Sequence, residues 1–221
     1  CTLTANSAAS NTEYGLRLDG CTGGSLSGNT LAGNGYNFRL DGQSDAQYDH
    51  TIDATNTVDG KPIIYVSGVS GQTFDSASNA GTLYLVNCSD ITLRGLTLTK
   101  NGVGALLWNV QRAQIEDVQA TGNSTGLWLR RSSASTIRGV KASNNSYAGI
   151  HLENASDNTL LDNQAAGNGY CGVYLQSASS NALTNTVLLQ NTNGLIIRTG
   201  YSNQVCNNSF LNNSAQISVS G

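Results

Sequence analysis

The residues best suited to chemistry are two Arg-x-Asp pairs near the amino terminus. Arg17 and Asp19 form the first pair, and Arg39 and Asp41 repeat the pattern one repeat unit later. A glycosidase needs two carboxylates roughly 5 to 10 Å apart, one of them a general acid. Here an Arg two residues before each Asp keeps both carboxylates ionised. Salt bridges are therefore the favoured interpretation, and Arg39 and Asp41 are only weak candidates for catalysis.

A second group of residues could bind rather than react. On the repeat described below, one column of side chains should face outward from a sheet, and it is rich in rings. Its members and their neighbours form a predicted exposed stripe, namely Tyr65, Tyr84, Trp108, Trp128, His151 and Tyr174. Such a stripe is typical of a protein interface, where aromatic residues are enriched, and we favour that interpretation. The alternative is a surface on which sugar rings stack, with His151 and Glu153 as a further weak acid-base candidate.

Other kinds of site find no support in the sequence. Charged residues make up 11% of the chain and the net charge is −3, which does not suggest nucleic acid as a partner. There is no Met, the two His are far apart, and the five Cys lack metal-ligand spacing. No apolar run is long enough to span a bilayer. We therefore predict no metal, no cofactor and no membrane span.

An internal repeat of about 22 residues supplies the elements that position these residues. The chain has 25 Gly and one Pro, and its repeated segments alternate apolar and polar residues, as in a half-buried strand. The segments are GLRL from Gly15, NFRL from Asn37, IIYV from Ile63, TLYL from Thr82, GALL from Gly104, GLWL from Gly126, GIHL from Gly149, GVYL from Gly172, GLII from Gly194 and QISV from Gln216. No unit has room for a useful helix.

Stacked units of this length predict an all-β fold, a single-stranded right-handed parallel β-helix of about ten rungs. One column of the repeat is Asn, and stacked Asn side chains can form an internal hydrogen-bonded ladder. The ladder residues are Asn101, Asn123, Asn145, Asn168, Asn191 and Asn213, with Asn11 and Asn34 expected to join them. We expect one domain over residues 1–221.

One rung is longer than the others and departs from the pattern. It includes an excursion at residues 41–62, which holds the only Pro and several acidic residues. A tolerated surface insertion is the favoured interpretation. The alternative is that function was grafted onto this loop.

The repeat units, of the form G-[IVL]-x-L followed by an Asn-rich turn, resemble NosD-like right-handed β-helix proteins, also called the carbohydrate-binding and sugar-hydrolase group. The stretch Asn56–Tyr65 adds to this resemblance, which covers essentially the whole chain. The resemblance implies that the protein is exported. The group includes polysaccharide lyases, epimerases, adhesins and archaeal surface proteins. Some members of the group bind copper, but the residues present here do not support a copper site.

The two ends of the chain show no capping helix or loop, although a β-helix exposes strand edges at its ends. The last residue falls just before the first in the phase of the repeat, so copies stacked head to tail would continue the coil. We therefore predict an extracellular, non-enzymatic protein of the cell surface that assembles into a filament. The alternatives are an excised fragment, or a protein that binds or cleaves polysaccharide.

The cysteines offer a related prediction. Cys21 and Cys88 lie three rungs apart, farther than the limit of about 7 Å between Cα atoms in a disulfide. Cys1 would lie one rung from Cys21 in its own chain, or one rung from Cys206 of the preceding subunit. The disulfide candidates are thus Cys1, Cys21 and Cys206, and the register alone does not choose between the two pairings.

Overall fold

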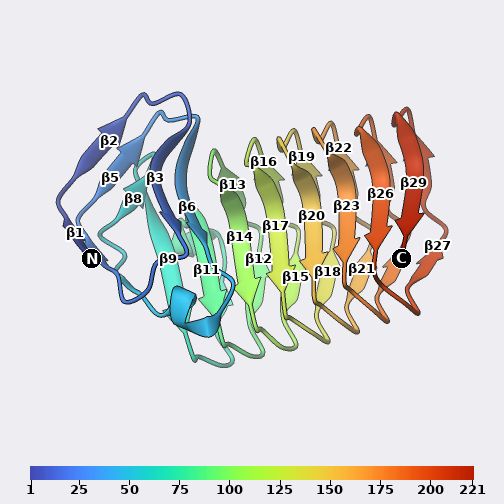
Figure 1. Ribbon diagram of the computed structural model, residues 1–221, viewed down its shortest axis with the longest axis horizontal. Helices are drawn as coiled ribbons and strands as arrows, with labels where there is room; N and C mark the ends of the chain where they lie inside the picture. The colour runs from blue at the N-terminus through green and yellow to red at the C-terminus, as the bar shows by residue number, and fades with distance from the viewer.

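Figure 1 shows the computed structural model of the protein, which describes residues 1–221 as a right-handed parallel β-helix of about ten turns. Strands form nearly all of its regular structure, and the exceptions are two short 3₁₀ segments, η1 (Asp45–Tyr48) and η2 (Ser76–Ser78). Neither is long and apolar enough to cross a bilayer. The predicted all-β fold is confirmed.

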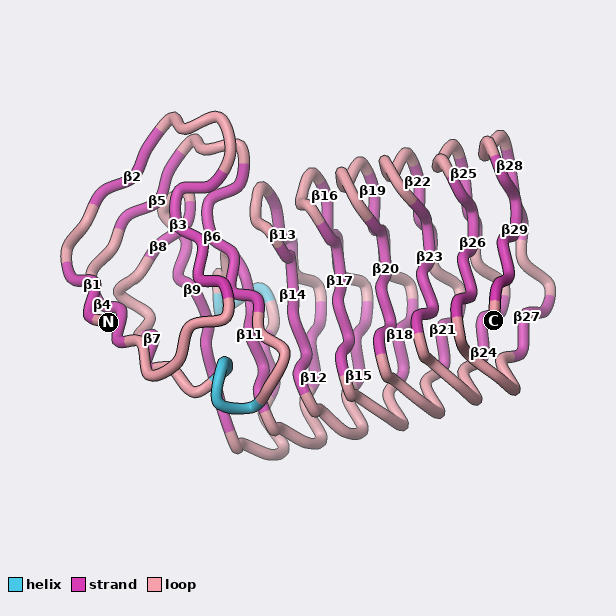
Figure 2. The backbone as a smooth tube through the Cα atoms, in the orientation of Figure 1, coloured by secondary structure: helices cyan, strands magenta, loops and turns pink.

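Residues 61–221 form the main coil, whose strands pair in parallel within three sheets (Figures 1 and 2). The long sheet contains β9 (Lys61–Ser67), β11 (Thr82–Val86), β14 (Val103–Trp108), β17 (Thr125–Arg130), β20 (Ala148–Glu153), β23 (Cys171–Gln176), β26 (Asn193–Arg198) and β29 (Ala215–Ser220). The second sheet contains β10 (Thr73–Phe74), β12 (Thr92–Arg94), β15 (Gln114–Glu116), β18 (Thr136–Arg138), β21 (Thr159–Leu161), β24 (Ala182–Thr184) and β27 (Gln204–Cys206). The third contains β13 (Thr97–Thr99), β16 (Gln119–Thr121), β19 (Lys141–Ser143), β22 (Gln164–Ala166), β25 (Val187–Leu189) and β28 (Ser209–Leu211).

The register of the long sheet is the one that the repeat predicts. Leu107 pairs with Leu129 and Leu129 with Leu152, so that alternate residues of each strand enter a core of 31 buried side chains. The repeated Gly has a steric cause. A Cβ atom at Gly104 would lie 2.5 Å from the carbonyl oxygen of Gly126 in the next turn, and only Gly allows this approach.

The predicted Asn ladder is present in the main coil. The backbone N–H of Asn123 donates to Oδ1 of Asn145 at 2.9 Å, and that of Asn145 donates to Asn168 at 3.0 Å. The Asn145 Nδ2 atom donates in turn to the carbonyl of Ala120 at 3.1 Å. The same pattern links all six predicted residues, Asn101, Asn123, Asn145, Asn168, Asn191 and Asn213. Each side chain thus satisfies turn groups that are buried inside the coil.

Residues 1–58 form a second, shorter stack, the N-terminal coil. Its strands are β1 (Thr2–Thr4), β4 (Ser25–Ser27) and β7 (Thr51–Ile52); β2 (Ser7–Ala9), β5 (Thr30–Ala32) and β8 (Thr57–Val58); and β3 (Tyr14–Asp19) with β6 (Tyr36–Asp41). The chain then reverses at Asp59 and Gly60, both with positive φ, so that β8 pairs with β9 in the antiparallel direction and β2, β5 and β8 extend the long sheet. Asp-Gly favours such a hairpin turn.

This reversal corrects two sequence-based expectations. The predicted stack of the segment from Asn37 beneath that from Ile63 is wrong, because β6 pairs with β3 and not with β9. The Asn11 and Asn34 column is likewise separate from the main ladder, since Asn34 donates to Asn37, which donates to Asp59. The excursion at residues 41–62 is therefore not a surface insertion in one coil. It contains η1, β7 and β8, and it connects the N-terminal coil to the first strand of the main coil, β9.

Candidate functional site

Part of the N-terminal coil lies on the outer face of the long sheet, with β3 and β6 in front of it in Figure 1. Backbone hydrogen bonds join the two parts, since Gly102 N donates to the carbonyl of Phe38 at 2.9 Å. The Phe38 ring meets the Tyr84 ring edge-on at 5.3 Å, and Leu40 N donates to the Tyr84 hydroxyl at 3.1 Å. The outer face of the sheet is thus an internal interface over these turns.

The predicted stripe keeps its register but is not exposed. Trp128 pairs with His151, and His151 with Tyr174, as the repeat requires. The fractional exposures are 0% for Tyr84, 1% for Trp108, 7% for Trp128, 3% for His151 and 2% for Tyr174, while Tyr65 is half-buried. The expected exposure was wrong because the N-terminal coil covers the first part of this row, and neighbouring rings cover the rest.

Aromatic contacts show how the row is covered. The Tyr48 ring, from η1, lies 4.3 Å from the Trp108 ring, and the Arg39 guanidinium lies over Trp128 at 5.7 Å. Farther along, the exposed ring of Tyr147 meets His151 edge-on. No periodic signal in the sequence connects Tyr48 with Trp108, so the repeat could not reveal this contact.

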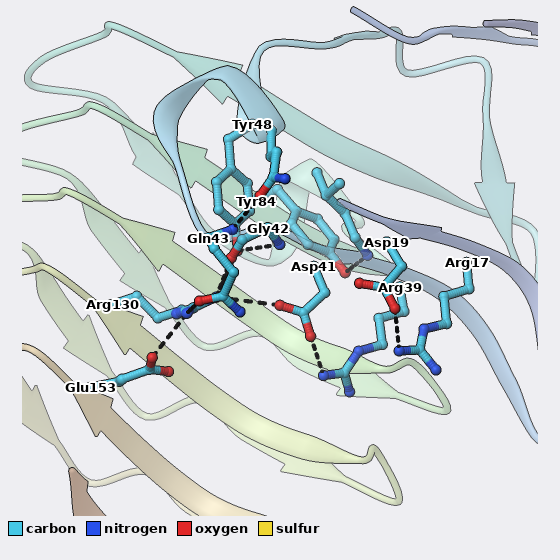
Figure 3. Close-up of polar contacts among 12 residues, drawn as sticks. Arg17, Asp19, Arg39, Asp41, Gly42, Gln43, Tyr48, Tyr84, Arg130 and Glu153 are labelled. Atoms are coloured by element: carbon cyan, nitrogen blue, oxygen red, sulfur yellow. Dashed lines mark hydrogen bonds and ion pairs between the residues drawn. The ribbon is translucent and has the colours of Figure 1, made fainter. Parts of the chain in front are cut away.

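The two Arg-x-Asp pairs form salt bridges within their own strands (Figure 3). The nitrogen-oxygen distance is 2.7 Å in both the Arg17–Asp19 and the Arg39–Asp41 pair. The second pair is largely buried, whereas the first is exposed to solvent. The favoured salt-bridge interpretation is confirmed, but the partners lie two residues apart in one strand and not on neighbouring strands.

Arg130 has a structural role that the sequence did not predict. Its side chain, 4% exposed, lies beneath the excursion and donates to the Gly42 carbonyl, to Asp41 at 3.3 Å and to Gln43 at 2.9 Å (Figure 3). A further hydrogen bond at 2.9 Å joins it to Glu153 of the next turn. This network fixes the excursion over β17 and ties β17 to β20.

A pocket of about 320 Å³ opens where the covered part of the long sheet ends. We call it the junction pocket, because β6 supplies one wall and the main coil supplies the rest. It is lined by Arg39, Ser124, Thr125, Trp128, Tyr147, His151, Glu153 and Gln176. The structure thus brings together Arg39, Trp128 and His151 from the predicted sites, together with Glu153.

Unpaired polar atoms gather at the junction pocket. The Nε atom of Arg39, the indole nitrogen of Trp128 and both ring nitrogens of His151 are buried without a hydrogen-bond partner. Such atoms are rare in folded proteins, because each one loses its hydrogen bonds to water. All of these atoms are shielded from solvent, so they lie within the wall of the pocket and do not face its open space.

His151 is held as a neutral imidazole. Its ring is stacked between Trp128 at 5.3 Å and Tyr174 at 4.6 Å. Burial is the main cause that lowers the pKa of His151 to about 3; the neighbouring Gln176 side chain opposes this shift, and the Arg130 cation adds to it. One ring nitrogen of a neutral imidazole donates a hydrogen bond and the other accepts one, but both are buried here.

None of the five cysteines lines this pocket. Cys1 and Cys206 are exposed, Cys21 is half-buried with its sulfur 3.5 Å from the Asp19 carbonyl, and Cys88 and Cys171 are buried. All five are free thiols in the structure. The pairing of Cys1 with Cys21 or with Cys206 of another subunit stays a prediction.

Comparison with known proteins identifies the family. The family model of the periplasmic copper-binding protein (NosD) matches residues 61–221, which is most of the chain and coincides with the main coil. The chain belongs to the NosD family. No curated protein sequence matches it.

Solved structures resemble this NosD-family chain in fold. The A-module of mannuronan C-5 epimerase AlgE6 from Azotobacter vinelandii aligns with a TM-score of 0.50 and 13% identity, covering 100% of this chain and 79% of the epimerase chain. The surface adhesin PfbA of Streptococcus pneumoniae aligns with a TM-score of 0.26 and 12% identity, covering 98% and 84% of the two chains. At 13% identity the likeness to the AlgE6 module concerns the fold alone, and the PfbA alignment supports no conclusion.

The residues of this NosD-family chain do not fit the copper site that the family description implies. His50 uses both ring nitrogens, one accepting from Gly24 N at 2.9 Å and the other hydrogen-bonded to the Gln47 carbonyl at 3.0 Å. His151 is stacked between two rings, and no three His, Cys, Asp or Glu side chains are grouped as metal ligands. Copper sites are built from imidazole, thiolate, thioether or oxygen ligands, and no such set converges here.

The Arg130 network yields a first prediction. Replacing Arg130 with Leu should destabilise the protein by about 3 kcal/mol or more, because Asp41 and Glu153 lose a buried partner. The measurement is equilibrium unfolding in guanidinium chloride, together with proteolysis of residues 42–60. Arg138→Leu is the matched control, since its pair with Asp162, at 3.6 Å, is solvent-exposed and should matter little. Equal losses in both variants would contradict the assigned role.

The low pKa of His151 yields a second prediction. As the pH falls below about 6.5, the unfolded chain takes up a proton that the folded imidazole refuses until about pH 3. Stability should therefore decrease by about 3 kcal/mol between pH 6.5 and pH 4 through this group. His151→Phe lacks the group and should show a shallower loss when unfolding is measured at pH 7, 5 and 4. Identical pH dependence in the two proteins would exclude a neutral, buried imidazole.

Proposed function

We propose that this NosD-family chain is an exported β-helix protein of the cell envelope or surface that binds a polysaccharide in the junction pocket. The observation that carries the proposal is a pocket that places the polar side chains of Glu153 and Gln176 beside the exposed ring of Tyr147. The periplasmic description of the NosD family supports the location.

The chemistry of the pocket suits a sugar. Its volume of about 320 Å³ accommodates a small ligand, and only a few polar groups are needed to orient one. Glu153 and Gln176 can accept from or donate to hydroxyl groups, and the Arg39 cation adds a donor. The Tyr147 ring, 36% exposed and stacked on Tyr170 at 5.0 Å, offers a flat apolar surface for a sugar face.

The proposal concerns binding, and cleavage or epimerisation of the bound chain is the alternative. The AlgE6 relative acts on mannuronan, which makes this acidic polysaccharide a reasonable first probe, with a neutral β-glucan beside it. An absorbance assay for unsaturated products separates lyase activity from binding. Arg39 and Asp41, the weak catalytic candidates, are engaged with each other at 2.7 Å, which favours a binding role for Arg39.

The binding proposal predicts the effect of removing the exposed ring. On an array that holds mannuronan and β-glucan oligosaccharides, Tyr147→Ala should bind about tenfold more weakly, because an aromatic contact is lost. Tyr201→Ala, a matched exposed tyrosine outside the pocket, should leave binding unchanged. Full affinity of Tyr147→Ala, or no binding by the wild-type protein, would contradict the proposal.

Head-to-tail self-assembly is a second candidate function, and exposed core positions favour it. Ile217 and Val219 in β29 follow the inward column of Leu195 and Ile197, yet they are 49% and 69% exposed. At the opposite edge of the same sheet, β2 runs antiparallel to β29 because the chain reverses before β9. A joint between copies would therefore pair antiparallel strands, and the parallel continuation inferred from the phase of the repeat does not hold. The exposed Cys1 and Cys206 could reinforce such a joint.

Self-assembly predicts a simple change in particle size. Ile217→Asp should convert assembled material to monomer, because a charge in the joint is not solvated. Light scattering and electron microscopy give the readout. Ser218→Asp, on the outward face of the same strand, is the control and should still assemble. Monomeric wild-type protein at every concentration tested would exclude this function.

A further inference from the structure

We infer that the junction pocket binds the end of a glycan chain, and that the rest of the chain lies along the uncovered part of the long sheet. The inference rests on the proposed glycan function and adds which part of the polymer is recognised. It depends on where the pocket is closed and where it is open.

The first closed side faces the amino terminus. There β6 lies against the main coil, and a Cβ atom at Gly102 would meet the Arg39 side chain at 2.5 Å. The Arg39 guanidinium covers Trp128, and beyond it Phe38 and Tyr48 cover Tyr84 and Trp108. No passage for a sugar chain remains beneath this strand.

Two lateral sides are closed by contacts between the coils. At the beginning of the strands, the Tyr36 hydroxyl donates to the Ser146 hydroxyl at 2.5 Å, next to Tyr147. At the end of the strands, Arg130 connects Gln43 of the excursion to Glu153 of β20, with both hydrogen bonds at 2.9 Å. The β6 wall and these two contacts between the coils therefore bound the pocket on three sides.

The fourth side opens toward the carboxyl terminus. Figure 1 shows that β3 and β6 lie in front of the first strands of the long sheet and leave β23, β26 and β29 uncovered. From the pocket residue Gln176, the outward column continues in register with Arg198 and Ser220, which are both exposed. Two further turns at about 4.8 Å each give a polar track of about 10 Å.

A chain bound at its middle would have to leave the pocket on two sides, and only one is open. The terminal sugar would therefore lie between Arg39, Tyr147 and Glu153, which line the pocket. The following sugars would lie over Gln176 and Arg198. This arrangement selects an end of the polymer, whichever sugar forms it.

Stoichiometry on a long polymer tests the inference. Monodisperse mannuronan and β-glucan of increasing length are saturated with protein, and bound protein per chain is measured by light scattering and ultracentrifugation. End recognition predicts one protein per chain at every length. A number that grows with length would overturn end recognition while leaving glycan binding intact. Absence of binding to either polymer in all length classes would overturn both.

The track is tested separately with Arg198→Ala. This variant should bind a hexasaccharide of the recognised polymer several-fold more weakly than the wild-type protein, and a disaccharide equally well, because only the longer ligand reaches β26. Arg94→Ala, which removes an exposed Arg on the second sheet, is the control and should change neither affinity. Equal affinity of wild-type and Arg198→Ala protein for the hexasaccharide would overturn the assigned path.

Discussion

The guanidinium of Arg130 lies where the two coils meet, and the architecture of the pocket depends on its partners. A cation removed from water is costly unless hydrogen bonds and opposite charges replace its hydration. The repeat supplies only Glu153, from the next turn. The remaining partners are Asp41, the Gly42 carbonyl and Gln43, all from the segment that follows β6. Satisfying this one charge therefore requires the N-terminal coil to lie on the sheet, which in turn forms the wall that carries Arg39.

The main coil could be predicted from sequence because its contacts are between neighbours in a periodic stack. Each turn meets only the turns before and after it, so a fixed spacing determines both the register and the partners. Leu129 must lie between Leu107 and Leu152, and Asn145 between Asn123 and Asn168. Two local rules are sufficient to predict the main coil: apolar and polar residues alternate in strands, and buried backbone groups must be hydrogen-bonded.

The fold-back could not be predicted in the same way, because its contacts are not periodic. Tyr48 meets Trp108 and Asp41 meets Arg130 across long stretches of sequence, with no repeated spacing between them. One local signal was present, since Asp59-Gly60 is a typical hairpin dipeptide. It falls within the irregular excursion and would have indicated the reversal of β8 into β9. Without the reversal, the outward rings of the long sheet were expected to face solvent.

Covering part of the aromatic row changes what the row can do. An exposed, flat row of rings would offer similar contacts at every turn, so a ligand could bind at any position along it. The wall of β6 ends the accessible part of the row at a defined turn. At that boundary Trp128 and His151 keep polar atoms that neither the repeat nor the N-terminal coil satisfies. The turns farther along lack the wall, and those nearer the amino terminus lack the space. The junction pocket therefore forms where the regular stack meets the reversed coil, and it combines residues that the repeat alone would not bring together.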